Sequence, residues 1–260
     1  MTTMADLSPS EAAREYHERG FVLLRSFFDA RTMERITEDA ERLWINEAGL
    51  IARDNLRCRY MPHHATGESL FECFDPIIDL SANMALAARD ERLLDVLGAI
   101  YGEKAYLFKD KLIFKPAGAN GYPLHQDYIA WDSFPKSFLT VLIPIDASTE
   151  ENGCTVVYEG YHREGLMTPA DGKFYPTPSE RVSDERRVAL EMQPGDIAIF
   201  DGFTPHHSNP NRSAQARRQL YFSYNAQRDG GDQREEHYRE FHRWLKEKYP
   251  PQNGKDWYFA

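Results

Sequence analysis

The chain of 260 residues carries 31 basic and 41 acidic residues, and 42% of its residues are hydrophobic. A chain of this length can bury a large core without disulfides, and its net charge of −10, with no Lys/Arg-rich run, argues against a nucleic-acid partner. The N-terminus has no basic region followed by an apolar stretch, and about 18 consecutive apolar residues occur nowhere. We therefore expect a cytoplasmic protein with no membrane association and no evident obligate protein partner.

The first part of the chain, residues 1–104, is expected to be mostly helical. Ser8 and Glu11 have the spacing of a capping box, with Pro between them at the first helical position, and Gly20 is placed to end that helix. Apolar residues then recur with a helical period in two further segments. Helices are expected over about 8–19, 29–47 and 90–102, with a short buried strand at 20–28.

From residue 105 onward the pattern changes to short runs rich in β-branched and aromatic residues, each bounded by Gly, Pro, Asn or Asp. These runs are 105–116, 137–146, 153–160, 187–193, 196–202 and 218–225. Their cadence is typical of an antiparallel barrel or jelly roll. We expect a single domain, 1–260, mainly β with flanking helices, whose double-stranded β-helix (jelly-roll, cupin-like) core spans about 105–228. A C-terminal helix over about 233–249 should dock on its outside.

The stretch YPLHQDYIAW places His125 and Asp127 two residues apart. On a strand they would share one face, so an imidazole nitrogen and a carboxylate oxygen could bind one ion. A later strand that starts at Arg217 can lie beside this one in a jelly roll, which would bring His206 or its neighbour His207 to the same ion. Two histidines and one carboxylate are the usual ligands of non-haem Fe(II) oxygenases, with open positions for a cosubstrate and dioxygen.

These motifs in this order resemble the phytanoyl-CoA dioxygenase (PhyH) family of Fe(II)- and 2-oxoglutarate-dependent oxygenases. The resemblance covers HQD, NGCTVVYEGYH, HHSNPN and Arg217, and an opening segment EYHERGFVLLRSFFDARTMERI, from about residue 15 to 226. It implies that His125, Asp127 and His206 bind Fe(II), and it selects His206 over His207. An Ala or Gly replaces the carboxylate in related halogenases, so Asp127 argues against halogenation.

In the family, an Arg eleven residues after the distal His binds the far carboxylate of 2-oxoglutarate, which here selects Arg217 over Arg218. A planar guanidinium can make two parallel charge-assisted bonds to a carboxylate. Pattern alone leaves the choice open, because the strand face of Arg218 is apolar and the face of Arg217 is polar. The family's second contact to this carboxylate matches Ser208.

Lys109 and Lys111 share a strand face just upstream of HQD, where the family has side chains that contact cosubstrate or substrate. We assign Lys109 to the cosubstrate and Lys111 to the substrate; a solvated strand edge is the alternative. Trp131 matches a site-lining Trp of the related ectoine hydroxylases, although the rest of their signature around it is absent. The irregular segment 161–184 has the length typical of a lid.

The resemblance predicts a dioxygenase that uses Fe(II), 2-oxoglutarate and O2 and releases succinate and CO2. It would hydroxylate or oxidatively cyclise a small polar metabolite or a sugar-containing intermediate of natural-product biosynthesis. One alternative is an oxygen-independent, cupin-like metal hydrolase or isomerase, which would leave Arg217 without a role. Another is a β-sandwich binding module that has lost its metal, for which some member of the triad should be missing.

Overall fold

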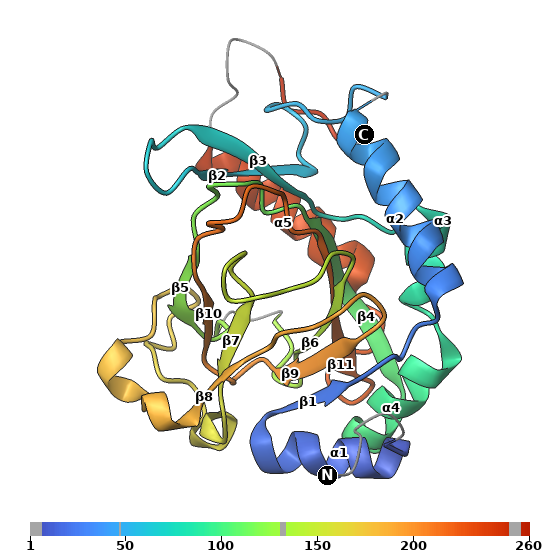
Figure 1. The fold of residues 1–260 in the computed structure, drawn as a ribbon. Coiled ribbons are helices and arrows are strands. Elements are labelled where there is room, and N and C mark those ends of the chain that lie inside the picture. Colours follow the sequence, from blue (N-terminus) through green and yellow to red (C-terminus); the bar gives the residue numbers. More distant parts are fainter. Residues whose placement is uncertain (1–6, 47, 131–133, 250–255) are drawn as a thin grey trace.

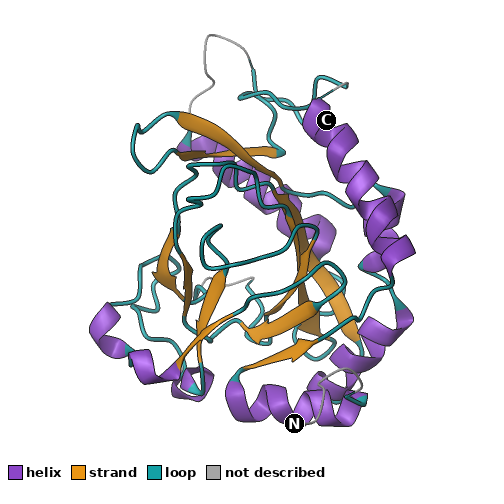
Figure 2. Ribbon diagram, viewed as in Figure 1, coloured by secondary structure: helices purple, strands orange, loops and turns teal. Residues whose placement is uncertain are grey.

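The computed structural model describes residues 7–46, 48–130, 134–249 and 256–260. It is a mainly β structure with helices on the outside (Figures 1 and 2). The helices are α1 (Pro9–Arg19), α2 (Ala30–Ile45), α3 (Ala82–Ala87), α4 (Glu91–Tyr101) and α5 (Arg234–Lys248). The strands are β1 (Phe21–Leu24), β2 (Cys58–Pro62), β3 (Ser69–Phe74), β4 (Ala105–Ile113), β5 (Tyr122–His125), β6 (Leu139–Pro144), β7 (Thr155–Tyr158), β8 (Arg187–Ala189), β9 (Ile197–Asp201), β10 (His206–Ser208) and β11 (Gln219–Ala226). No helix in the described ranges is both long and apolar enough to cross a bilayer.

The strands form two antiparallel sheets. The larger sheet has the order β1-β9-β6-β11-β4-β3-β2 and the smaller one β5-β10-β7-β8. Apolar side chains from both sheets, among them Leu142, Val157 and Phe200, pack into one cluster, so the sheets face each other. The predicted jelly-roll, cupin-like class is confirmed, with the two sheets remaining unclosed at their edges.

The two faces of β11 have different environments. Leu220, Phe222 and Tyr224 are fully buried in the large apolar cluster that the helices cover. Tyr221 and Ser223, which alternate with them, line a cavity between the sheets. The sequence pattern left open which face of this strand lines the space between the sheets. In the structure the polar face lines the cavity and the apolar face packs on the helices.

The helices begin and end close to the expected residues because their termini are specified locally. Ser8 and Glu11 form the capping box, and Gly20 adopts φ +83° at the end of α1. The strand expected at 20–28 is shorter, since Ser26 takes a positive φ of 52° and turns the chain. The expected strand 187–193 is reduced to β8.

Residues 1–104 also contain the hairpin β2–β3, which the sequence analysis missed. This hairpin joins the larger sheet beside β4, with Cys73 opposite Ile113 and Phe74 opposite Leu112. The N-terminal part is therefore less purely helical than expected, and its strands extend the same sheet that carries the core.

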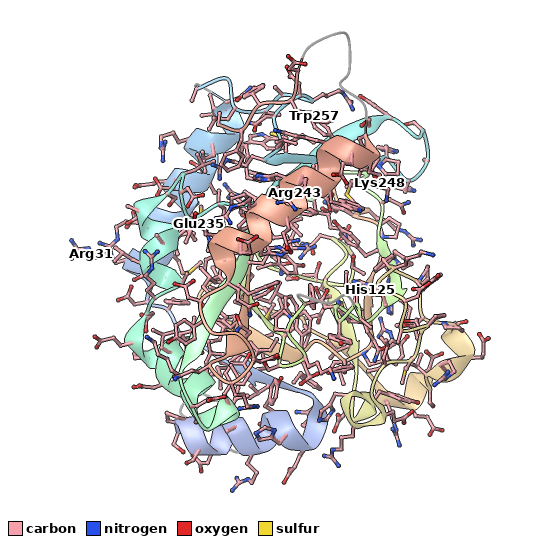
Figure 3. All side chains as sticks on the ribbon, turned by 180° about the vertical axis from the view of Figure 1, so that it is seen from behind. Arg31, His125, Glu235, Arg243, Lys248 and Trp257 are labelled. Carbon is pink, nitrogen blue, oxygen red and sulfur yellow. The ribbon has the colours of Figure 1, made fainter. Side chains whose placement is uncertain are left out.

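Helix α5 lies across the outer face of the larger sheet, and Figure 3 shows it from behind with Glu235, Arg243 and Lys248 along its length. Its first residue, Arg234, pairs through Nε with Asp110 Oδ2 at 2.6 Å. The other oxygen of the fully buried Asp110 accepts the backbone N–H groups of Ile77 and Ile78. This carboxylate thus joins β4, α5 and the chain after β3.

We expect Asp110→Ala to lower the free energy of unfolding by about 3–5 kcal/mol, because it leaves two buried N–H groups without their acceptor and the guanidinium of Arg234 with Asp79 as its remaining carboxylate. Urea denaturation followed by circular dichroism measures this difference. Arg239→Ala, which removes two solvent-exposed ion pairs on the same helix, is the control and should change stability by less than about 1 kcal/mol. Equal losses in the two variants would contradict the role assigned to Asp110.

Candidate functional site

His125, Asp127 and His206 come together at one point between the sheets. Their nitrogen and oxygen atoms, one from each side chain, all lie within 4.8 Å of one another. His125 ends β5 and His206 begins β10, and the two residues are direct partners in the antiparallel pair. It is β10, a three-residue strand that the sequence analysis did not identify, and not β11, that lies beside β5. Asp127 lies in a bend just past the end of β5 and not on the strand itself.

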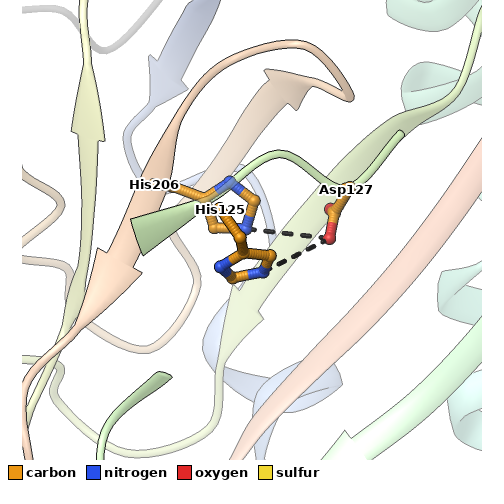
Figure 4. A group of neighbouring side chains, drawn as sticks. All are labelled: His125, Asp127 and His206. Carbon is orange, nitrogen blue, oxygen red and sulfur yellow. Dashed lines mark ion pairs between the residues drawn. The ribbon is translucent and has the colours of Figure 1, made fainter. Parts of the chain in front are cut away.

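Backbone carbonyls orient both imidazoles. Nδ1 of His125 lies 2.7 Å from the carbonyl oxygen of Pro123, and Nδ1 of His206 lies 3.0 Å from that of Thr204. Since a carbonyl only accepts, each Nδ1 carries the proton and each Nε2 presents a lone pair. Figure 4 shows both Nε2 atoms directed at Asp127 Oδ1, at 3.8 Å for His125 and 3.7 Å for His206. These distances exceed those of hydrogen bonds.

The carboxylate of Asp127 is fixed by its second oxygen. Oδ2 accepts a hydrogen bond of 3.1 Å from the hydroxyl of Thr140, which is itself 3.2 Å from Ser223 Oγ. Oδ1 is left facing the two histidines. Thr140 was not identified from the sequence, although a polar residue in the middle of the apolar run SFLTVLIPID was a usable signal.

The charge states of His125 and Asp127 suit metal binding. Burial, together with the neighbouring His206, lowers the pKa of His125 to about 4, so this imidazole is neutral at neutral pH. Burial raises the pKa of Asp127, but His206, His125 and Lys111 outweigh it and hold this pKa below its usual value. A neutral imidazole and an ionised carboxylate are the forms in which these side chains bind metals.

The three side chains border a cavity of about 330 Å³. Its wall also includes Lys111, Thr140, Tyr221 and Phe174. Phe174 belongs to the predicted lid segment 161–184, is 52% exposed, and has its ring centre 5.4 Å from that of His125. This segment therefore lies beside the cluster of His125, Asp127 and His206, at the solvent side of the cavity.

The two competing residues, His207 and Arg218, make other contacts, although His207 also borders the cavity. The ring of His207 lies 5.8 Å from that of Tyr158, and His207 is not part of the cluster of three. Arg218 makes two side-chain hydrogen bonds to Asp146, through Nε at 2.8 Å and Nη2 at 2.7 Å. The guanidinium of Arg218 is thus already paired with a carboxylate of the protein.

Arg217 is 2% exposed, and its Nε and Nη1 have no hydrogen-bond partner among the described residues. Unpaired N–H groups of a buried guanidinium are costly, and a carboxylate from a ligand would satisfy them. Ser208 lines the cavity, and its Oγ accepts hydrogen bonds from Lys115 Nζ at 2.9 Å and from the backbone N–H of Tyr122 at 3.3 Å. The sequence analysis did not identify Lys115.

Lys109 and Lys111 both line the cavity, from β4. The ammonium of Lys109 pairs with Asp75 Oδ2 at 3.2 Å, so its charge is already balanced. Lys109 lies opposite Ser223 on β11, six residues and therefore about 20 Å along the strand from Arg217. The role of Lys109 as a cosubstrate contact stays a prediction. Trp131 falls outside the described residues.

Comparison with known proteins agrees with this geometry. The model of the phytanoyl-CoA dioxygenase (PhyH) family matches residues 16–219. A 2-aminoethylphosphonate dioxygenase from an uncultured bacterium is 29% identical, over 95% of this chain and 92% of its own. A methylphosphonate hydroxylase from Gimesia maris is 30% identical, over 86% and 82%. The crystal structure of EctD from S. alaskensis with 2-oxoglutarate and 5-hydroxyectoine superposes with a TM-score of 0.70 at 23% identity, over 88% of this chain and 79% of EctD.

The family match confirms the predicted enzyme class, an oxidoreductase of the dioxygenase type that uses iron, 2-oxoglutarate and O2. The likeness to EctD by itself shows the fold alone. Because the family model spans more than half of the chain and the methylphosphonate hydroxylase shares 30% of its residues, this chain belongs to the phytanoyl-CoA dioxygenase (PhyH) family.

Proposed function

We propose that this chain oxidises a small polar metabolite, by hydroxylation or oxidative ring closure, with His125, Asp127 and His206 holding Fe(II) and Arg217 and Ser208 binding 2-oxoglutarate. The observations that carry the proposal are the cluster of His125, Asp127 and His206 on one cavity and the buried guanidinium of Arg217, whose Nε and Nη1 have no hydrogen-bond partner among the described residues. When bound, the iron would supply O2 activation at the expense of 2-oxoglutarate, which leaves as succinate and CO2.

The protein's own contribution is orientation. The carbonyl oxygens of Pro123 and Thr204 hold the histidine rings in the tautomer that leaves Nε2 free, and Thr140 holds Asp127 Oδ2 so that Oδ1 faces the two histidines. At the other end, the N–H groups of Arg217 and the hydroxyl of Ser208 are available as donors to the distal carboxylate of 2-oxoglutarate. A cosubstrate held at both ends would have one orientation in the cavity.

The cavity volume supports a small substrate. Ligand pockets span roughly 300–1,000 Å³, and this cavity of about 330 Å³ must also accommodate the cosubstrate. Phe174 at the solvent side would contact whatever molecule is bound above His125.

Lys111 supports a substrate that carries a compact anionic group. Burial lowers the pKa of its ammonium, but Asp75 and Asp127 outweigh this and hold the pKa above its usual value, so the group is charged. Among the described residues no carboxylate is close enough to form an ion pair with it, and it lies 5.4 Å from the ring centre of Tyr221. The two relatives named for phosphonate substrates favour a phosphonate or carboxylate as this group. Two further roles rest on the family resemblance alone and stay proposals, Lys109 as a cosubstrate contact and Trp131 as a substrate contact.

The anaerobic apoprotein provides the test of this function. Addition of Fe(II) and then 2-oxoglutarate should give the weak visible charge-transfer band of the chelate. Succinate release in air should then be screened against small phosphonates, carboxylates and sugar derivatives. Metal-dependent activity without O2, with no such band, would favour the cupin-like hydrolase or isomerase instead.

With a substrate from this screen, we expect Lys111→Met to raise the KM for that substrate at least about tenfold, because it removes a charge-assisted contact. The affinity for 2-oxoglutarate should stay unchanged. Lys104→Met, which removes an exposed lysine just before β4, is the matched control. If Lys111→Met leaves the substrate KM at the wild-type value, the anionic group of the substrate does not bind Lys111.

A further inference from the structure

Lys115 is a buried cation that the proposed function does not yet use. It follows β4, is 1% exposed, and its ammonium donates hydrogen bonds to the carbonyl oxygens of Gly153 at 2.9 Å and Asn209 at 2.6 Å. Its third hydrogen bond, at 2.9 Å, goes to the hydroxyl oxygen of Ser208. All three donors of the ammonium are therefore in use.

The chain is arranged to bring this ammonium to its acceptors. Gly153 has φ +73°, and a Cβ at this position would overlap Lys115 Nζ and the carbonyl oxygen of Asn209. The backbone oxygen of Lys115 accepts hydrogen bonds from the N–H of Arg217 at 3.2 Å and from Asn211 Nδ2 at 2.9 Å. Lys115 and Arg217 are thus tied to each other through the main chain.

The two cations form a positively charged cluster in the protein interior. Among the described residues neither Lys115 nor Arg217 has a carboxylate within ion-pair distance, and Arg217 Nε and Nη1 have no partner at all. Burial and the neighbouring Arg217 lower the pKa of Lys115 to about 7. A neutral donor could satisfy the carbonyls of Gly153 and Asn209 at a smaller desolvation penalty, so the turn alone does not explain a lysine.

The hydroxyl of Ser208 shows what the lysine adds. A serine hydroxyl has two acceptor sites and one donor. Lys115 and the N–H of Tyr122 use both acceptor sites of the Ser208 hydroxyl. Because Ser208 lines the cavity, its hydroxyl proton is available to a ligand there. A positively charged donor to Ser208 also makes that hydroxyl a stronger donor in turn.

We propose that Lys115 is a positioning residue for 2-oxoglutarate: it fixes Ser208 as a hydrogen-bond donor to the distal carboxylate and adds a second positive charge beside Arg217. This rests on the proposed function, in which that carboxylate binds Arg217 and Ser208. Lys115 itself acts through Ser208 and through its charge, and its three hydrogen bonds to the protein remain in place.

Calorimetry of 2-oxoglutarate binding to the anaerobic Fe(II) protein tests the proposal. Lys115→Met should weaken binding about tenfold with Fe(II) affinity unchanged. Ser208→Ala should weaken it as well, and the double variant should lose less than the product of the two single effects, because both act on one hydrogen bond. Multiplicative losses in the double variant, or wild-type affinity in a folded Lys115→Met protein, would overturn the proposal.

The pH dependence of the unmodified protein gives a second measurement that does not need a stable variant. The groups that face Lys115 are Arg217, Cys154, Glu72 and His207. Burial raises the pKa of Glu72 to about 7, and burial together with Arg187 lowers the pKa of His207 below its usual value. A bound carboxylate favours the charged ammonium, so binding should take up protons and weaken as pH rises through about 7. In Glu72→Gln, 2-oxoglutarate binding should still weaken as pH rises through about 7. A binding affinity that no longer depends on pH in this variant would overturn the proposal.

The two proposals fail in distinguishable ways. If the Fe(II) protein binds no 2-oxoglutarate at all, the proposed function is wrong. If it binds 2-oxoglutarate and depends on Arg217, but neither Lys115→Met nor pH changes the affinity, the function stands and Lys115 only holds the turn.

Discussion

His206→Ala is expected to abolish Fe(II) binding, whereas His207→Ala is expected to leave it unchanged. His206 supplies one of three donor atoms that lie within 4.8 Å of one another, and its Nδ1 is engaged by Thr204, so Nε2 has no other role in the described structure. Loss of even a residue that orients a metal ligand typically lowers affinity 10–100-fold, and loss of a ligand itself should exceed that range.

The neighbouring histidine is a closely matched control. His207 follows His206 on the same short strand, but its ring lies against Tyr158 and outside the cluster. Metal content after dialysis, and thermal stabilisation by added Fe(II) or Mn(II) under anaerobic conditions, measure the effect. A ligand at about 100 times its Kd stabilises the folded state by about 2.7 kcal/mol, and this gain should vanish in His206→Ala alone. The opposite result would move the third ligand to His207.

The residues with local signals were the ones that the sequence predicted well. The ends of α1 depend on Ser8, Glu11 and Gly20. Each of these residues bonds to groups within about one helical turn along the chain, so its role can be predicted without knowing the fold. The class of the fold followed from the cadence of strands and from the family resemblance. Neither of these depends on which strands are neighbours.

Features that depend on contacts distant in the sequence were missed or misplaced. The hairpin β2–β3 has no clean alternation, because it buries Glu72 and Cys73 in succession beside β4, so its pattern does not read as a strand pair. Strand β10 has three residues, too few to show a period. His125 and Asp127 were predicted to lie close together because both would lie on one face of a strand. They do lie close together, but Asp127 lies in a bend beyond the strand, and it is this bend that brings the two groups together.

Which cation pairs with which carboxylate was the feature hardest to predict from the sequence. Lys109 and Lys111 look equivalent on one strand face, yet Asp75, 34 residues before Lys109, pairs with Lys109 and not with Lys111. Arg217 and Arg218 look equivalent as well, and Asp146 pairs with Arg218. In both cases the cation that the protein leaves without a close carboxylate is the one proposed to meet a ligand.

Arg217→Lys is expected to weaken 2-oxoglutarate binding about 10–100-fold while Fe(II) binding stays at the wild-type level. The guanidinium offers parallel N–H groups to a carboxylate, and a lysine ammonium replaces them with a single charge on a shorter reach. Since a hydrogen bond to a charged group contributes about 1.5–3 kcal/mol, the loss of one such bond accounts for this range.

Arg218→Lys is the matched control, because it makes the same chemical change one residue away. Arg218 is bound to Asp146 through Nε and Nη2, so its replacement should lower stability slightly and leave 2-oxoglutarate affinity unchanged. Anaerobic titration of the Fe(II) protein with 2-oxoglutarate, followed by the visible band or by calorimetry, measures both. Unaltered affinity in Arg217→Lys would mean that the distal carboxylate binds elsewhere, and the buried, unpaired Nε and Nη1 of Arg217 would then need a different anion.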